Sequence, residues 1–177
     1  MKINIDSYFS EIAHPIIDTP EYKSMKKFVA HGPYSVYDHC LRVTIFAYSF
    51  AKSRYMNIDY EVLIRGSLLH DFYLYDWHKK EKYHSFHGFK HPVFALFNAS
   101  RKYKLKPKEM NMIRSHMFPL TLLHIPLSKE AWILCYADKV CAYHEHQAIK
   151  KIKKDQKSLK KAEKNSALKV NEAVINP

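Results

Sequence analysis

The sequence predicts an all-α protein folded as a single-domain helical bundle. Its 177 residues are enough to bury one sizeable hydrophobic core and too few for two. Only three residues are glycine, whereas an all-β protein needs glycine at many tight turns. Thirteen tyrosines and ten phenylalanines supply large apolar side chains for packing between helices.

Proline, glycine and capping residues divide the chain into helices. A short helix is expected after Pro20, and Gly32 and Pro33 end it. Ser35, Asp59 and Ser128 suit the N-cap positions of three later helices. Pro92 is expected in the first turn of the fourth helix, where proline is favoured. The expected helices cover residues 21–29, 36–55, 60–72, 92–103, 107–118 and 129–149.

Two segments lack a helical hydrophobic pattern. Residues 73–90 combine charged and aromatic side chains without a clear period, so we expect an ordered loop or lid. Residues 150–177 carry nine lysines against three acidic residues, so they hold +6 of the total charge of +12. We expect this lysine-rich segment to continue the last helix in solvent or to fray, as a unit separate from the domain at 1–149. Without interleaved aromatic residues, it gives little support for nucleic-acid binding.

Cysteine content and hydropathy bear on the cellular compartment. The three cysteines are odd in number and form no CxxC pair, which fits a reducing environment. The N-terminus has no apolar stretch that suits a signal peptide, and nowhere do about 18 apolar residues run together. We therefore expect a cytoplasmic protein without a membrane partner. The remaining net charge of +6, which is spread over residues 1–149, suits an anionic small-molecule substrate.

Histidine and aspartate side chains interrupt the apolar faces of the expected helices. In one helix, Leu63 and Ile64 lie at the start of an apolar face, and His70 and Asp71 lie at its end. Burial of an unpaired carboxylate is unfavourable, whereas coordination to a metal ion compensates it. The same pattern recurs on four other helices, at His39, His91, His116 and Asp138. A single histidine of this kind is usually an ordinary hydrogen-bonded core residue, but the set of imidazoles and carboxylates on five helices predicts a metal centre.

The order of these residues resembles the HD-domain superfamily of metal-dependent phosphohydrolases. The segments HCLRV (39–43), LLHDF (68–72) and YADKV (136–140) are similar to its three motifs. His91 and His116 occupy the places of two further histidines in the two-metal branch, which includes bacterial diadenosine tetraphosphate hydrolases and cyclic-dinucleotide phosphodiesterases. Over HGFKHP, IRSHMFPLT and YADKVCA, the chain is also similar to uncharacterised bacterial HD-domain phosphohydrolases. The resemblance covers about residues 31–145.

The resemblance implies a dinuclear metal site and a hydrolytic activity. One ion would be held by His39, His70, Asp71 and Asp138, and a second by His91, His116 and Asp71 as a bridging ligand. These ligands suit iron or manganese, with nickel, cobalt or zinc as alternatives, better than magnesium alone. A hydroxide between the ions would attack a phosphate ester or anhydride, expected to belong to a nucleotide. The alternative is a non-catalytic protein of the same fold that serves as a nucleotide-binding or regulatory module.

Arg42 is a candidate for contact with the substrate. It lies one helical turn from His39, and its planar guanidinium would hold a phosphate group. A salt bridge from Arg42 to Asp71 or Asp138, as support for the metal ligands, is equally compatible with the sequence.

The expected loop supplies a candidate general acid. His87 lies four residues before His91 and could protonate the leaving oxygen. Many relatives have a lysine three residues after the His-Asp pair, where this chain has Leu74, so a role assigned to that lysine does not carry over. Further along, His144 and His146 diverge by about 200° around a helix, so they are not expected to share an ion.

Overall fold

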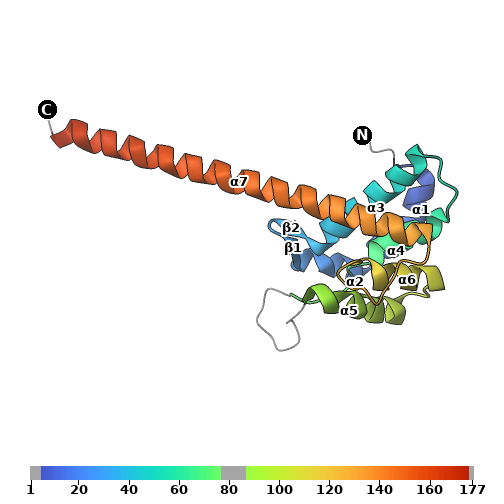
Figure 1. The fold of residues 1–177 in the computed structure, drawn as a ribbon. Coiled ribbons are helices and arrows are strands. Elements are labelled where there is room, and N and C mark those ends of the chain that lie inside the picture. Colours follow the sequence, from blue (N-terminus) through green and yellow to red (C-terminus); the bar gives the residue numbers. More distant parts are fainter. Residues whose placement is uncertain (1–4, 77–86, 176–177) are drawn as a thin grey trace.

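The computed structural model describes residues 5–76 and 87–175 and is almost entirely helical (Figure 1). The prediction of an all-α fold is therefore confirmed. The side chains of His87 and of residues 161–175 lie outside the described part. The elements are α1 (Ser7–Ile17), α2 (Pro20–Ser24), the 3-10 helix η1 (Met25–Lys27), β1 (Val29–His31), β2 (Tyr34–Ser35), α3 (Val36–Ser53), α4 (Tyr60–Leu69), α5 (His87–Lys102), α6 (Pro107–Ser115) and α7 (Lys129–Ile175).

The predicted N-caps are confirmed. Ser35, Asp59 and Ser128 each accept a hydrogen bond from the backbone amide three residues further on. The Asp38 carboxylate also accepts from the backbone amide of Ser35, which completes a capping box. Such caps satisfy amides at the helix start that have no partner within the helix, and each contributes about 1 kcal/mol. The caps thereby fix where α3, α4 and α7 begin.

The N-terminal region differs from the prediction in two places. Residues 7–17 form α1, for which no helix was expected. The expected helix over 21–29 stops early, and β1 pairs antiparallel with β2 through a tight turn in which Gly32 has φ +56°. Glycine adopts this left-handed conformation at low cost, which explains its position in the turn. The hairpin brings His31 to the start of α3.

Helix α5 begins earlier than expected. It starts at His87 rather than after His91, so Pro92 lies inside the helix instead of in its first turn. The expected loop therefore loses residues 87–90 to α5, and its segment 77–86 lies outside the described residues. Among its remaining residues, 73–76 are not helical.

Close packing of α4 against α6 brings two histidines together. A Cβ atom on Gly66 would lie 2.6 Å from the end of the Met112 side chain, so any larger residue at position 66 would force Met112 to move. Both helices end at a histidine C-cap, His70 for α4 and His116 for α6. The two imidazole rings lie with their centroids 4.9 Å apart. The close helix pair thereby places two predicted metal ligands side by side.

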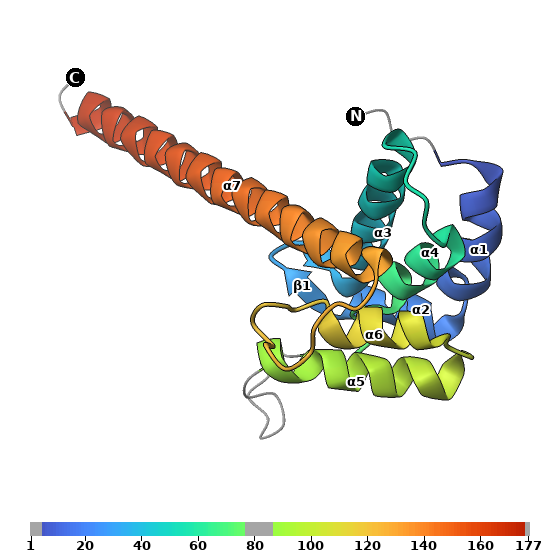
Figure 2. The same cartoon turned by 45° about the vertical axis from the view of Figure 1, so that its right-hand side comes forward.

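The remaining core joins the other helices to this pair. Helix α3 packs against α4 and α7, and α6 packs against both α5 and α7 (Figures 1 and 2). Large side chains that are fully buried between these elements include Leu63, Ile64, Leu68, Met112, Ile113 and Leu134. This packing directs the start of α3, the ends of α4 and α6, and the first part of α7 toward one region.

Helix α7 continues without a break into the lysine-rich segment, so of the two expectations for this segment, the continued helix is the one observed. It extends as a single rod far beyond the other helices (Figure 1). The side chains of residues 150–160 are exposed. No helix in the described part of the chain is both long and apolar enough to span a bilayer. The division of the chain at residue 149 stays a prediction.

Candidate metal centre

The predicted ligands from five helices converge at one cavity. It has a volume of about 1030 Å³, and its wall includes five of the six: His39, Asp71, His91, His116 and Asp138. The sixth, His70, is wholly buried and lies 3.7 Å from an oxygen of Asp71. The structure thus brings together all six residues that the sequence singled out.

The first group of donor atoms surrounds one carboxylate oxygen of Asp71. Asp71 Oδ2 lies 4.0 Å from His39 Nε2 and 3.7 Å from His70 Nε2. Asp138 Oδ1 lies 3.1 Å from His39 Nε2 and 3.8 Å from His70 Nε2. Two imidazoles and two carboxylates therefore face one point.

The second group surrounds the other oxygen of the same aspartate. Asp71 Oδ1 lies 3.2 Å from His91 Nε2 and 3.4 Å from His116 Nε2, and the two Nε2 atoms are 2.8 Å apart. Asp71 thus directs one oxygen toward each group.

These spacings fit ligands that share a divalent ion. With bonds of about 2.1 Å, adjacent donors are about 3.0–3.4 Å apart and opposite ones about 4.2 Å. Among the six predicted ligands, two buried atoms also lack a hydrogen-bond partner in the described part of the chain, namely His70 Nε2 and Asp71 Oδ1. Since buried polar atoms are normally satisfied, both observations favour a cation between the groups. Within the described residues, the donor atoms of His39, His70 and Asp71 lie close enough to hold a metal ion, and so do those of Asp71, His91 and His116.

Hydrogen bonds at the far side of each ring fix the tautomer of three histidines. Nδ1 of His70 donates to the carbonyl of Ser67 at 2.7 Å, and Nδ1 of His116 donates to that of Ile113 at 2.8 Å. A carbonyl can only accept, so Nδ1 carries the proton in both rings and the neutral ring keeps a lone pair on Nε2. His39 is held in the same way through Nδ1, which lies 3.0 Å from Glu145 Oε2. In the neutral form of each ring, Nε2 is therefore the atom that can bind a metal ion.

The charges of the site favour a bound cation. Burial opposes ionisation, but hydrogen bonds to Asp138 and Glu145 outweigh it and raise the pKa of His39 to about 10. Burial likewise opposes ionisation of Asp71 and Asp138, yet the neighbouring histidines hold both carboxyl pKa values well below their usual range. Burial lowers the pKa of His116, which keeps that ring neutral. The ionised carboxylates that attract protons to His39 also attract a metal ion in their place.

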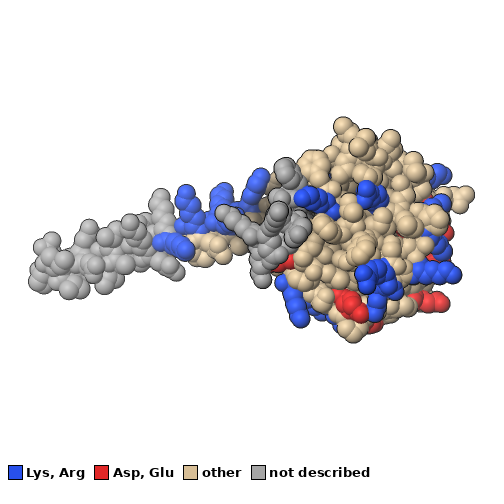
Figure 3. Space-filling view, turned by 90° about the horizontal axis from the view of Figure 1, so that it is seen from below, with Lys and Arg blue, Asp and Glu red and all other residues tan. Residues whose placement is uncertain are grey.

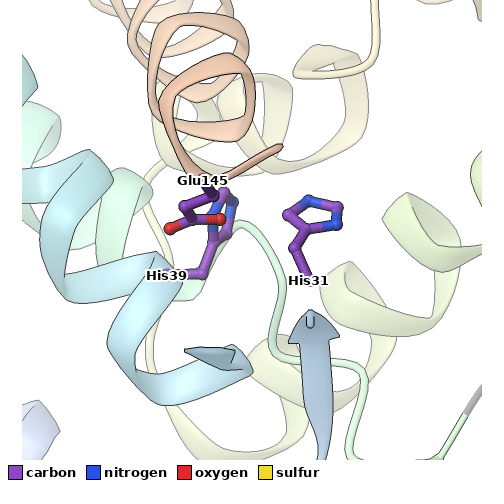
Figure 4. Close-up of side chains that lie close together, drawn as sticks. All are labelled: His31, His39 and Glu145. Atoms are coloured by element: carbon purple, nitrogen blue, oxygen red, sulfur yellow. The ribbon is translucent and has the colours of Figure 1, made fainter. Parts of the chain in front are cut away.

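Two residues at the site escaped the sequence analysis. Glu145 on α7 is buried beside His39, and His31 at the end of β1 points into the same space (Figure 4). Donor atoms of these three residues lie within 4.8 Å of one another, a spacing that could itself hold an ion. Because His39 Nδ1 is bonded to Glu145, we interpret Glu145 as the group that orients His39. Glu145 follows Asp138 by seven residues, two helical turns on the same face, and this spacing could have identified it.

Replacement of Glu145 by glutamine should weaken metal binding without unfolding the protein. The amide keeps the shape of the carboxylate but removes the charge that orients His39 and increases its basicity. Loss of such a partner typically lowers metal affinity by about 10–100-fold. Titration of metal-free protein with Mn²⁺ would measure the change, with the exposed Glu11→Gln variant as control. Unchanged affinity in Glu145→Gln would contradict this role.

Among the described contacts, Arg42 touches none of the six predicted ligands. The Arg42 guanidinium lies over the ring of Tyr34 at 4.1 Å, and its ion pair at 3.8 Å is with Glu145. The alternative of a salt bridge to Asp71 or Asp138 is therefore not found among the described ion pairs, and a contact of Arg42 with substrate phosphate stays a prediction. Lys139 lines the cavity, and its Nζ donates to the carbonyl of His116 at 3.1 Å.

The general-acid candidate can be located only by its backbone. His87 is the first residue of α5, and its side chain lies outside the described part. The next residue, Gly88, lines the cavity. Helix α5 therefore begins at the cavity wall.

Comparison with known proteins identifies a family. The family model of the HD domain matches residues 36–143, a range that contains all six predicted ligands. Comparison with curated proteins finds no match, and comparison with solved structures finds none either.

Proposed function

The chain belongs to the HD domain family, whose members are generally metal-dependent phosphohydrolases, and we propose that it hydrolyses a phosphate ester or anhydride of a nucleotide. The observation that carries this proposal is the division of the two Asp71 oxygens between two groups of histidines. We propose that iron or manganese ions, two per chain, occupy these groups, with nickel, cobalt or zinc as alternatives. When bound there, such ions activate water and neutralise charge on a phosphoryl group.

Electrostatics of the cavity explain why the carboxylates need a positive partner. Asp71 and Asp138 are ionised and both line the cavity. Alone, they would repel a phosphate group at short range. The site therefore binds an anionic substrate only when its negative charge is compensated. This requirement supports a metal-dependent activity.

The rest of the cavity wall suits an organic phosphate. Met117, Pro119 and Leu120 form an apolar side, and the Tyr73 phenol lies in the wall with them. Burial, followed by the charge of Asp71, raises the pKa of Tyr73 far above its usual value, so its phenol stays protonated. A volume of about 1030 Å³ accommodates a ligand of nucleotide size. We assign the apolar side to the leaving group and the His87 position, at the wall, to its protonation.

Metal analysis joined to a phosphate-release screen tests the proposed activity. Protein purified without chelator should release phosphate from at least one nucleotide, and chelation should abolish the release until Mn²⁺ or Fe²⁺ is restored. The control is His70→Ala, which should lose the response to metal. A protein that binds nucleotides yet releases no phosphate with any of the five metals would instead be a binding module.

Arg42→Ala should impair substrate binding and leave the metal content unchanged. The ion pair between Arg42 and the buried Glu145 is long, and Arg42 itself is half exposed. Glu145 binds His39 through its other oxygen, so loss of the pair should hardly affect His39. Loss of one charge-assisted contact to phosphate raises KM by roughly 10-fold. Steady-state kinetics and elemental analysis would measure both quantities, with the exposed Arg54→Ala as control. Loss of metal from Arg42→Ala would instead assign Arg42 to the support of Glu145.

A further inference from the structure

The segment between α6 and α7 exposes an unusual amount of apolar surface. In this apolar loop (residues 117–128), Leu122, Leu123 and Leu127 are 69%, 93% and 79% exposed. Leu120 and Ile125 are about half exposed, and Leu120 contacts the start of α5 near Gly88. Exposed aliphatic clusters of this kind on a soluble surface usually mark a binding surface.

Hydrogen bonds hold the apolar loop in this conformation. The Asn111 side chain donates to the carbonyl of Ile125 at 3.1 Å and accepts from the amide of Leu127 at 2.9 Å. At the base of the loop, the Phe118 ring packs edge-on against Trp132 at 5.4 Å. The backbone is therefore anchored to α6 and α7 while the leucine side chains point outward.

The segment that contains the apolar loop carries mainly positive charge. Residues 87–137 contain eight Lys and Arg residues and only two acidic ones, Glu109 and Glu130. Both glutamates are buried, so the charged side chains of this segment at the surface are cationic. Three of the eight cations, Lys102, Lys106 and Lys108, pair with carboxylates, so the attraction of an anionic partner depends on other cations of the segment. Figure 3 views the body from the side on which α5 lies, and blue Lys and Arg stand among tan groups while Asp and Glu appear mainly toward the rim.

Aromatic side chains of α5 extend the same surface. Phe89, Val93 and Phe97 are each exposed and follow one another at intervals of four residues, so they share one side of the helix. Arg101 lies over the Phe97 ring at 5.5 Å. The apolar loop and this side of α5 thus combine exposed aliphatic, aromatic and cationic groups.

In contrast to the expectation from sequence that the chain has no membrane partner, we propose that this surface docks onto an anionic membrane and inserts the leucines of the apolar loop at the boundary between headgroups and acyl chains. Apolar side chains next to cations match the interfacial region of such a membrane. A second copy of the chain fits less well, since dimerisation through this surface would bring two cationic surfaces together. The exposed lysines at the start of the lysine-rich segment add further attraction to the membrane.

Vesicle co-sedimentation of the full chain tests the proposal through two matched variants. Leu123 is 93% exposed on the apolar loop, and Tyr55 is 94% exposed at the far end of α3. Leu123→Asp and Tyr55→Asp therefore make the same change of charge at equal exposure. Tyr55 has φ +50°, a conformation that aspartate tolerates, so both variants should fold. The vesicles contain phosphatidylcholine alone or with about 30 mol% phosphatidylglycerol.

We expect the unmodified chain to bind the anionic vesicles and to bind less at high salt. Leu123→Asp should weaken binding by about 10-fold or more, and Tyr55→Asp by much less. Equal binding of the two variants would overturn the proposal, because the attraction would then come from charge alone. Equal binding to neutral and anionic vesicles would also overturn the proposal. So would light scattering that shows the unmodified chain to be a dimer and the Leu123→Asp variant to be a monomer, because the surface would then bind a second copy.

Discussion

Asp71→Ala is expected to remove both metal ions and to abolish hydrolysis. Its two oxygens are the atoms that both groups of histidines share, at 3.7–4.0 Å on one side and 3.2–3.4 Å on the other. Without them, the first group keeps two imidazoles and the single carboxylate of Asp138, and the second keeps two imidazoles and no carboxylate. We expect the rate of phosphate release to fall by on the order of 1000-fold or more.

Elemental analysis and circular dichroism would separate loss of metal from loss of fold. The variant Asp71→Asn keeps the volume of the side chain and removes its charge, so it should fold like the unmodified chain and still lose metal. Asp155→Ala, at an exposed position of α7, serves as control for the removal of a carboxylate. If Asp71→Ala kept about two ions, the bridging role would be wrong.

The predicted ligands could be found from sequence because their signal is local. His70 and Asp71 end an otherwise apolar helical face, and the motifs around His39 and Asp138 are contiguous. The N-caps are local as well, since the capping side chain bonds to an amide three residues away. These features depend on neighbours in the sequence and so are visible without the fold.

Other features depend on contacts between distant segments. The turn at Gly32 and Pro33 is compatible with a helix end or with a hairpin, and only the pairing of β1 with β2 decides between them. Helix α5 extends back to His87 although the sequence offers glycine and proline in its first turns, and Gly88 in the first turn lies against Leu120 from the segment after α6. Tertiary packing overrides local propensity here.

The position of Glu145 in the sequence suggests two different environments, and only the structure decides between them. Its spacing from Asp138 is helical, yet the run of charged and polar residues that includes His144 and His146 is typical of an exposed face. Packing of α7 against α3 buries Glu145 and leaves both histidines exposed. The approach of α7 to His39 joins residues 106 positions apart, and no local signal predicts it.

The number of ions can be decided with His116→Ala. In a site with one ion, His39, His70, Asp71 and Asp138 would suffice, and His91 and His116 would be ordinary core histidines. In a site with two ions, His91 and His116 hold the second together with Asp71. The two nitrogens lie 2.8 Å apart and each lies within 3.4 Å of Asp71 Oδ1, which supports the second arrangement.

We therefore expect His116→Ala to lower the metal content from about two ions per chain to about one, and to remove most activity. The change removes no donor atom of the first group, because His116 Nε2 approaches Asp71 Oδ1 and His91 Nε2, and the contact of its ring with His70 is only edge-on packing. His124→Ala, at a histidine outside the cavity wall, controls for the loss of an imidazole. Unmodified protein that saturates at one ion, together with unchanged metal content and rate in His116→Ala, would refute the dinuclear site. Retention of the second ion in His116→Ala with only the rate reduced would instead assign His116 to the substrate.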